Sequence, residues 1–378
     1  MGKMCLIEEM PKKLGFGCMR LPIVDGKDDV IDYDRFSAMI DTYMNKGFCY
    51  FDTAYPYHRE KSEEAVRKCL VERYPRDSFF LADKMPVWLV KEQKDYMTIF
   101  EKQLERTGVS YFDFYLLHAL NQDRVNDLEK TGGFEFAQKL KKEGLARNVG
   151  FSFHDSAEVL ENILKNHPEL DFVQLQINYF DWDTDHVQSA KCYEVAEKYQ
   201  VPVIVMEPVK GGMLANMIGK PAQLLQNLDS SASYASFAIR FAASLPNVMV
   251  VLSGMSDEQQ LQDNISYMQD FKPLTETEKN TIMQVREELA KMIAVGCTNC
   301  RYCVPECPKK IMIPSVFTVY NMAKQFGVNE QTIRNYHNVT GQDRGKASDC
   351  IKCGKCEKQC PQHLEIRELM ETIAKTFE

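Results

Sequence analysis

The sequence predicts an α/β fold in which a (β/α)8 TIM barrel is followed by a small, mainly helical domain. Three observations lead to this prediction. Short strand-like runs alternate with amphipathic stretches through roughly the first 270 residues, the length of one such barrel. Eight of the 13 cysteines then fall in two short runs near the C-terminus. Hydrophobic residues make up 44% of the chain and charged residues 26%, which excludes a disordered or collagen-like chain.

The strand candidates are eight runs rich in β-branched or aromatic residues. They begin at Gly15, Cys49, Phe79, Phe112, Arg147, Phe172, Val201 and Val248. Helical patterns follow them, most clearly over residues 34–45, 61–71, 91–106, 157–165, 187–199, 233–243 and 257–268. Eight such units in about 255 residues match a closed barrel. An open doubly wound sheet is the alternative, but the run "GFGCMR" lacks the third glycine of a dinucleotide-binding turn.

Composition narrows the classes of function. The chain has no run of about 18 apolar residues, and its start, "MGKMCLIEEMPKK", lacks the apolar segment of a secretory signal. We therefore expect a cytoplasmic protein that does not enter a membrane. The net charge is -8, and Lys and Arg are interspersed with acidic residues, so we expect no binding to nucleic acid.

Polar residues end three successive predicted strands: Asp52, Lys84 and His118, with Tyr57 in the loop after Asp52. The carboxyl ends of barrel strands meet at one face, so these side chains should converge there. Such a set suits the reduction of a carbonyl, because hydride arriving at carbon requires a proton at oxygen. We expect Tyr57 to donate that proton, with the Lys84 ammonium lowering its pKa from about 10. Asp52 would hold Lys84, and His118 would bind the substrate oxygen.

These residues lie in the motifs "FDTAYPYHREKSEEAV", "FLADKMP" and "DFYLLHAL", which resemble those of the aldo/keto reductases from about Leu14 to Phe271. By this resemblance Asp52, Tyr57, Lys84 and His118 match the catalytic tetrad of the family. The resemblance also implies a nicotinamide dinucleotide, NAD or NADP, extended across the barrel mouth without a Gly-rich turn. A small carbonyl compound is the implied substrate.

The resemblance also implies the residues that bind the dinucleotide. Ser152 and Gln174 would hold the carboxamide, and Met206 replaces the tyrosine that stacks on the nicotinamide in many members. Pro208 would also contact the dinucleotide, the pyrophosphate would lie near Gly211 and Gly212, and the adenosine end would lie near Ser253, Gly254, Gln260 and Asn264. Gly254 and Gln260 stand where NADP-preferring members have basic residues. Since 2′-phosphate recognition usually relies on Arg or Lys, we favour NAD slightly over NADP.

The two cysteine runs, "CTNCRYCVPECP" and "CIKCGKCEKQCP", both read C-x2-C-x2-C-x3-C-P. This is the spacing of ferredoxins with two 4Fe-4S clusters, in which the fourth cysteine of each run binds the other cluster. It assigns Cys297, Cys300, Cys303 and Cys360 to one cluster, and Cys350, Cys353, Cys356 and Cys307 to the other. Zinc is the competing metal, but its modules usually use two separated cysteine pairs.

These assignments divide the chain into a barrel over residues 1–272, a helical linker over 273–295 and a dicluster domain over 296–378. The insert between the cysteine runs is longer than in compact ferredoxins. It reads as two helices, Ser315 to Phe326 and Glu330 to Tyr336. We therefore expect a mainly helical, ferredoxin-like domain.

The two halves pose an electron-transfer problem, because nicotinamides exchange hydride whereas each cluster passes one electron at a time. A flavin is the usual converter, yet the sequence shows no flavin motif. The leading hypothesis is a carbonyl reductase whose clusters relay electrons or dock a redox partner protein. The alternatives are a nicotinamide-binding sensor whose clusters recognise a partner, and a reductase with structural clusters. Oxygen-sensitive clusters suggest an anaerobic organism.

Overall fold

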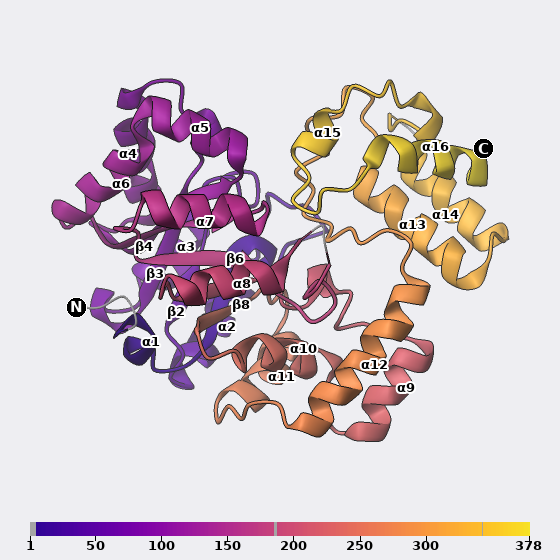
Figure 1. The fold of residues 1–378 in the computed structure, drawn as a ribbon, viewed down its shortest axis with the longest axis horizontal. Helices are drawn as coiled ribbons and strands as arrows, with labels where there is room; N and C mark the ends of the chain where they lie inside the picture. The colour runs from indigo at the N-terminus through magenta and orange to yellow at the C-terminus, as the bar shows by residue number, and fades with distance from the viewer. Residues whose placement is uncertain (1–4, 185–186, 342) are drawn as a thin grey trace. The chain divides into compact units, whose positions relative to one another are not determined.

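A computed structural model describes residues 5–184, 187–341 and 343–378 (Figure 1). Eight parallel strands follow one another around a closed barrel, and the first pairs with the last. This confirms the predicted (β/α)8 architecture. The strands are β1 (Leu14–Gly17), β2 (Tyr50–Asp52), β3 (Phe80–Met85), β4 (Phe112–Leu120), β5 (Ala146–Phe153), β6 (Phe172–Gln176), β7 (Val203–Met206) and β8 (Val248–Ser253).

Helices alternate with these strands along the chain, close to the ranges expected from apolar periodicity. They are α1 (Cys5–Glu9), α2 (Tyr33–Asn45), α3 (Ser62–Val66), α4 (Gln93–Thr107), α5 (Gln122–Thr131), α6 (Gly133–Lys142), α7 (Ala157–Asn166), α8 (Ser189–Lys198), α10 (Tyr234–Ala243) and α11 (Glu258–Met268). One expectation needs correction: the single helix over 61–71 is an α-helix that continues as a π-helix, Arg67–Val71. Short 3-10 turns occupy Cys18–Arg20, Arg76–Ser78, Val87–Leu89, Lys210–Gly212 and Ala347–Asp349.

Side chains two residues apart on a strand point to the same side, which explains how the barrel interior has an apolar layer followed by a layer of polar side chains. Tyr50, Ala82 and Phe172 belong to one buried apolar cluster. Two residues further along the same strands come Asp52, Lys84 and Gln174, which therefore face the same interior. Gln174 Nε2 donates to Asp52 Oδ2 at 3.0 Å, a bond that joins β6 to β2 across the interior.

The structure separates into two compact units. The second comprises Val209–Tyr234 and Glu276–Glu378, and the strands belong to the first. The second unit contains α9 (Gly219–Leu228), α12 (Glu276–Met292), α13 (Ile313–Phe326), α14 (Glu330–Thr340), α15 (Lys355–Lys358) and α16 (Ile366–Phe377). In Figure 1, α9 and α12 lie side by side, as do α13 and α14. The predicted helical character of the C-terminal region is confirmed, although Val209–Tyr234 joins it from within the barrel sequence.

Buried side chains of α13, α14 and α16, including Phe317, Tyr336 and Met370, form the core of the second unit, together with Cys303 and Cys356. The cysteine runs are therefore part of its packing. Among the described residues, no helix has both the length and the apolar character to span a bilayer.

Candidate active site and cysteine-rich region

The structure brings the four predicted catalytic side chains together. Lys84 Nζ donates to Asp52 Oδ1 at 2.5 Å, to the Thr53 carbonyl at 2.9 Å and to the Tyr57 hydroxyl at 3.2 Å. Lys84 is fully buried, and Asp52 and His118 are each 3% exposed. The His118 and Tyr57 rings are 6.2 Å apart between centroids. An ammonium, its carboxylate, a phenol and an imidazole thus share one end of the barrel.

Burial sets the protonation of the phenol and the imidazole. It raises the pKa of Tyr57 well above the usual range, and the charges of Asp52 and Glu207 raise it further. The expectation that the Lys84 ammonium leaves Tyr57 with a lowered pKa is therefore wrong for this structure, because desolvation of the phenolate outweighs the cation. Burial also lowers the pKa of His118 well below its usual range, aided by the positive charge of Lys84.

The turn that follows Tyr57 is held in a conformation that is rare for residues other than glycine. His58, Arg59 and Glu60 have φ of 50°, 52° and 68°, and each such residue costs roughly 1–2 kcal/mol. The His58 side chain, 5% exposed, anchors one end of this turn. Its Nε2 accepts the N–H of Leu21 at 3.0 Å, and its Nδ1 contacts the Asp28 carbonyl at 2.8 Å.

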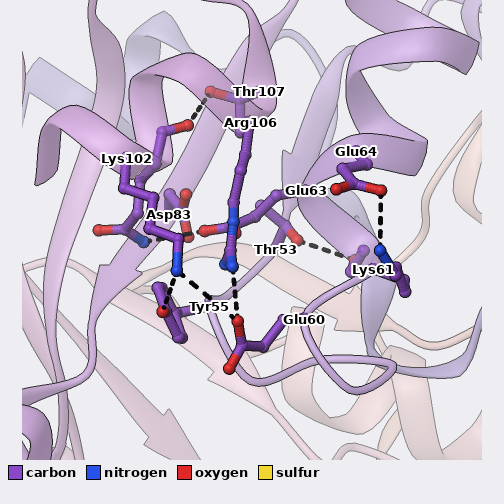
Figure 2. Close-up of polar contacts among 12 residues, drawn as sticks. Thr53, Tyr55, Glu60, Lys61, Glu63, Glu64, Asp83, Lys102, Arg106 and Thr107 are labelled. Carbon is purple, nitrogen blue, oxygen red and sulfur yellow. Dashed lines mark hydrogen bonds and ion pairs between the residues drawn. The ribbon is translucent and has the colours of Figure 1, made fainter. Parts of the chain in front are cut away.

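Arg106 of α4 anchors the other end of the turn (Figure 2). Its guanidinium donates to Glu60 Oε2 at 2.5 Å and to Glu63 Oε2 at 2.9 Å. Lys102, one helical turn earlier, donates to the Tyr55 hydroxyl at 2.9 Å. The strained turn is thus fixed at one end by the His58 ring, which contacts backbone groups of the segment after β1, and at the other end by side chains of α4. These contacts keep Tyr57 beside Lys84.

Ser152 and Gln174, predicted to hold the carboxamide, are register partners at the ends of β5 and β6 and are buried. The Ser152 hydroxyl oxygen accepts the N–H of Ala119 at 2.6 Å, which leaves its O–H able to donate. Gln174 uses its Nε2 on Asp52, which leaves its carbonyl able to accept. A donor and an acceptor side by side fit the carbonyl and the amino group of a carboxamide.

The residues predicted near the nicotinamide ring and the pyrophosphate are divided between the units. Met206, half-buried at the end of β7, and buried Pro208 belong to the first unit. Gly211 and Gly212, both with positive φ, belong to the second. A Cβ on Gly211 would lie 2.2 Å from the Thr298 carbonyl oxygen. Close backbone packing within the second unit thus already requires this glycine, whatever ligand it approaches.

The residues predicted for the adenosine end lie at the end of β8 and on α11. Asn264 Nδ2 donates to Ser253 Oγ at 2.7 Å, and Gln260 Oε1 accepts the N–H of Ser256 at 2.8 Å. A Cβ on Gly254 would lie 3.2 Å from Arg20 Cδ. Sequence reasoning missed this arginine, because it comes from the far end of the barrel sequence. Its guanidinium lies 3.7 Å from Glu207 Oε1, so the side chain of Arg20 passes beside Gly254 and its charge faces a carboxylate.

Three further residues surround His118. The Trp88 ring lies 5.1 Å from the His118 ring between centroids and is 41% exposed. Arg124 lies over the Trp88 ring at 5.1 Å and donates to the Ala119 carbonyl at 2.5 Å. Trp88 follows a predicted strand and could be suspected as a pocket wall or as packing, whereas Arg124 and His154 gave no comparable indication. The charges of Arg124 and His154 help to lower the pKa of His118.

Cysteines of the two runs lie close to one another in the structure. Cys350, Cys353 and Cys356 line one pocket together with Cys307, the fourth cysteine of the first run. Burial raises the pKa of Cys303, and the charges of Cys300, Cys297 and Cys360, and then of Cys356, raise it further, so these four cysteines lie near it.

This donor set fits 4Fe-4S clusters. The described His, Cys, Asp and Glu residues form no group of three that could hold a single metal ion, but a 4Fe-4S cluster does not require one, since each thiolate binds a different iron. The Asn299 N–H also points at Cys297 Sγ, 3.4 Å away, as expected for a thiolate ligand.

Comparison with known proteins identifies the family of each part of the chain. The model of the "Aldo/keto reductase family" matches residues 13–287, and that of the "4Fe-4S dicluster domain" matches residues 296–364. An uncharacterized oxidoreductase of Bacillus subtilis is 23% identical over 296 residues, 70% of this chain and 90% of that protein. A glyoxal reductase of Bacillus subtilis is 32% identical over 142 residues, 34% of this chain and 47% of that protein.

Solved structures share the barrel. An aldo/keto reductase from Klebsiella pneumoniae in complex with NADP and acetate aligns with a TM-score of 0.59 and 18% identity, covering 72% of this chain and 91% of that one. The holo form of an aldo-keto reductase from Bacillus halodurans aligns with a TM-score of 0.57 and 24% identity, again over 72% and 91%. At these identities the likeness shows the fold.

Proposed function

This chain belongs to the aldo/keto reductase family and carries a 4Fe-4S dicluster domain, and from that premise we propose that it reduces a small aldehyde or ketone with a nicotinamide dinucleotide. The observation that carries this proposal is the Tyr57 hydroxyl 3.2 Å from Lys84 Nζ at the end of the barrel. We propose Asp52, Tyr57, Lys84 and His118 as the catalytic residues. The two clusters would relay electrons or dock a redox partner protein.

The raised pKa of Tyr57 suits it to the reductive direction. The phenol keeps its proton at neutral pH and can give it to the carbonyl oxygen as hydride reaches the carbon. Lys84, itself paired with Asp52, then lies where it stabilises the phenolate that remains. His118 is neutral and can donate an N–H bond to the same substrate oxygen.

A reduced nicotinamide would supply the hydride, and we propose Ser152, Gln174 and Met206 as its contacts. Pro208, Gly211 and Gly212 would approach the pyrophosphate, and Ser253, Gly254, Gln260 and Asn264 the adenosine end. The side-chain carbons of Arg20 lie beside Gly254 and its guanidinium is 3.7 Å from Glu207 Oε1, so this cation would turn from Glu207 to meet a 2′-phosphate. A comparison of kcat/KM for NADH and NADPH, in wild type and Arg20→Met, decides between the two cofactors.

We assign one cluster to Cys297, Cys300, Cys303 and Cys360, and the other to Cys350, Cys353, Cys356 and Cys307. The cytoplasmic location and the anaerobic host stay predictions. Anaerobic addition of NADH or NADPH should bleach the visible cluster absorption if the clusters exchange electrons with the dinucleotide, directly or through a flavin. Unchanged absorption during carbonyl turnover would instead favour clusters with a structural or docking role.

Tyr57→Phe tests the catalytic assignment. Removal of the hydroxyl should lower kcat for carbonyl reduction by about 10²-fold or more, since general acid catalysis contributes 10²–10⁴-fold. Dinucleotide affinity, measured by fluorescence titration, should stay close to wild type. A Tyr57→Phe protein as active as wild type would remove the assigned acid, and tight dinucleotide binding without turnover of any carbonyl by wild type would favour the sensor hypothesis.

A further inference from the structure

Two carboxyl groups, Asp83 and Glu63, lie against each other (Figure 2). Both residues are 0% exposed. Asp83 precedes Lys84 on β3, so its side chain points to the opposite face of the strand, toward the helices. Its Oδ1 accepts the N–H of Lys84 at 2.7 Å. Its Oδ2 is also enclosed and finds no hydrogen-bond donor among the described residues.

The surrounding donors are directed at Glu63. Gln103 Nε2 donates to Glu63 Oε1 at 3.2 Å, and Arg106 donates to Glu63 Oε2 at 2.9 Å while it also binds Glu60. The charged or titratable groups that face the pair are Lys84 on β3, Arg106 on α4 and Tyr115 on β4. The Arg106 guanidinium therefore donates to two carboxylates, Glu60 and Glu63. A negative charge on Asp83 would be stabilised less than the charge on Glu63.

We propose that Asp83 and Glu63 share one proton at neutral pH and that this pair positions Lys84 and the turn after Tyr57. A proton on Asp83 turns its enclosed Oδ2 into a donor toward Glu63 and removes the repulsion between two buried anions. Asp83 then fixes the backbone of Lys84. Glu63 fixes Arg106, which in turn fixes Glu60 in the left-handed turn. Both acids are positioning residues, because they act on the donor pair through other groups.

The directions of the acid pKa values agree with this arrangement. Burial raises the pKa of Glu63, although Arg106 opposes the change. Burial raises the pKa of Asp83 well above its usual range, and the negative charge of Glu63 raises it further. The proton therefore belongs mainly to Asp83. Whether the pair serves catalysis rests on the proposed function, but the shared proton itself does not.

Asp83→Asn tests the shared proton, because an amide keeps the acceptor for the Lys84 N–H and places a permanent donor toward Glu63. We expect this variant to keep kcat/KM within about threefold of wild type at pH 7, since the geometry at Lys84 is unchanged. Asp83→Leu removes both bonds and should lower activity. The matched control is Asp113→Asn. Asp113 is equally buried but binds Arg76 and Arg147 at 2.6 and 3.0 Å, so its neutralisation should lower Tm.

A pH series gives a readout that is independent of activity. The folded wild type holds a proton on Asp83 that the unfolded chain releases above its ordinary pKa of about 3.9, so this site loses stability as pH rises. Asp83→Asn has no such loss. The Tm of the variant minus that of wild type should therefore increase from about pH 5 to about pH 8.

Infrared spectroscopy provides the second readout: wild type should show the carbonyl stretch of a buried protonated carboxyl group, and Asp83→Asn should lack it. The proposal is overturned if the Tm difference is independent of pH, or if Asp83→Asn is as damaging as Asp83→Leu. If no carbonyl is reduced by any variant while the band and the Tm trend are present, the proposed function fails and the shared proton stands.

Discussion

Burial acts in opposite senses on the charges of Tyr57 and His118, because it disfavours whichever form is ionised. The Tyr57 phenol keeps its proton, and the His118 imidazole stays neutral. At neutral pH the site therefore offers an uncharged acid and an uncharged hydrogen-bond donor beside a single buried ion pair, Lys84 with Asp52. In the proposed reaction the Lys84 cation would stabilise the charge that develops on Tyr57 when its proton leaves.

The lowered pKa of His118 predicts how kcat/KM changes as the pH becomes acidic. An ordinary histidine is protonated below about pH 6.5. We expect kcat/KM to stay level as pH falls through that value and to decline only in more acidic buffer. The profile should be measured with a carbonyl substrate that does not itself titrate in this range.

His118→Gln supplies the control for that profile, because an amide does not titrate. The variant should lose on the order of 10²-fold in kcat if its donor is misplaced, as when one oxyanion donor is removed, and its profile should lack the acidic decline. A wild-type decline centred near pH 6.5 that persists in His118→Gln would contradict the assignment.

At the scale of elements, the sequence predicts what periodicity encodes and misses what distant contacts impose. The eight strands and the residues at their ends follow from alternation, which is why Asp52, Lys84 and His118 could be chosen in advance. The π-helix Arg67–Val71 could not, since its apolar pattern is that of an ordinary helix. The left-handed turn over 58–60 contains no glycine, and Arg106, which holds it, lies 46 residues from Glu60.

His58 gives this turn a pH-dependent anchor. Burial lowers the pKa of His58, while the Asp28 carbonyl opposes the change. The folded state therefore needs the neutral ring, whose Nε2 accepts the Leu21 N–H. The stability from this contact is fully present above about pH 6.5 and is lost as pH falls through the lower folded-state pKa.

Substitution of His58 should show both the anchor and its titration. His58→Phe leaves the buried Leu21 N–H without an acceptor and should cost about 1–3 kcal/mol of unfolding free energy at pH 8. His58→Gln can still accept that bond and should recover part of the loss. The stability difference between wild type and His58→Phe, measured by urea unfolding, should shrink below about pH 6. A constant difference across this range would show that the ring acts by packing.

For the whole molecule, the barrel and the dicluster region can each be predicted from the sequence, whereas the grouping of one internal segment cannot. The segment Val209–Tyr234 lies in sequence between β7 and β8, yet it groups with the C-terminal unit. Its local pattern gives no sign of this, because the grouping reflects long-range packing: α9 lies against α12, and the backbone of Thr298 lies close to Gly211. Residues predicted to meet one dinucleotide, Pro208 and Gly211, thus belong to different compact units.

Iron should stabilise one unit far more than the other. Cys303 and Cys356, which belong to the cysteine runs, lie in the core of the second unit. The described cysteines of the barrel are far from these runs in sequence. Loss of the clusters would leave buried thiols around empty space, and metal-site binding energy is folding energy. We expect calorimetry of the anaerobic protein after chelation of its iron to show an early transition for the second unit and a barrel transition near its original temperature.

Cys353→Ser should lower the iron content from about eight to about four per chain, whereas the control Cys192→Ser, in the barrel, should leave it unchanged. A single transition that shifts as a whole on iron removal would mean that the two units unfold together.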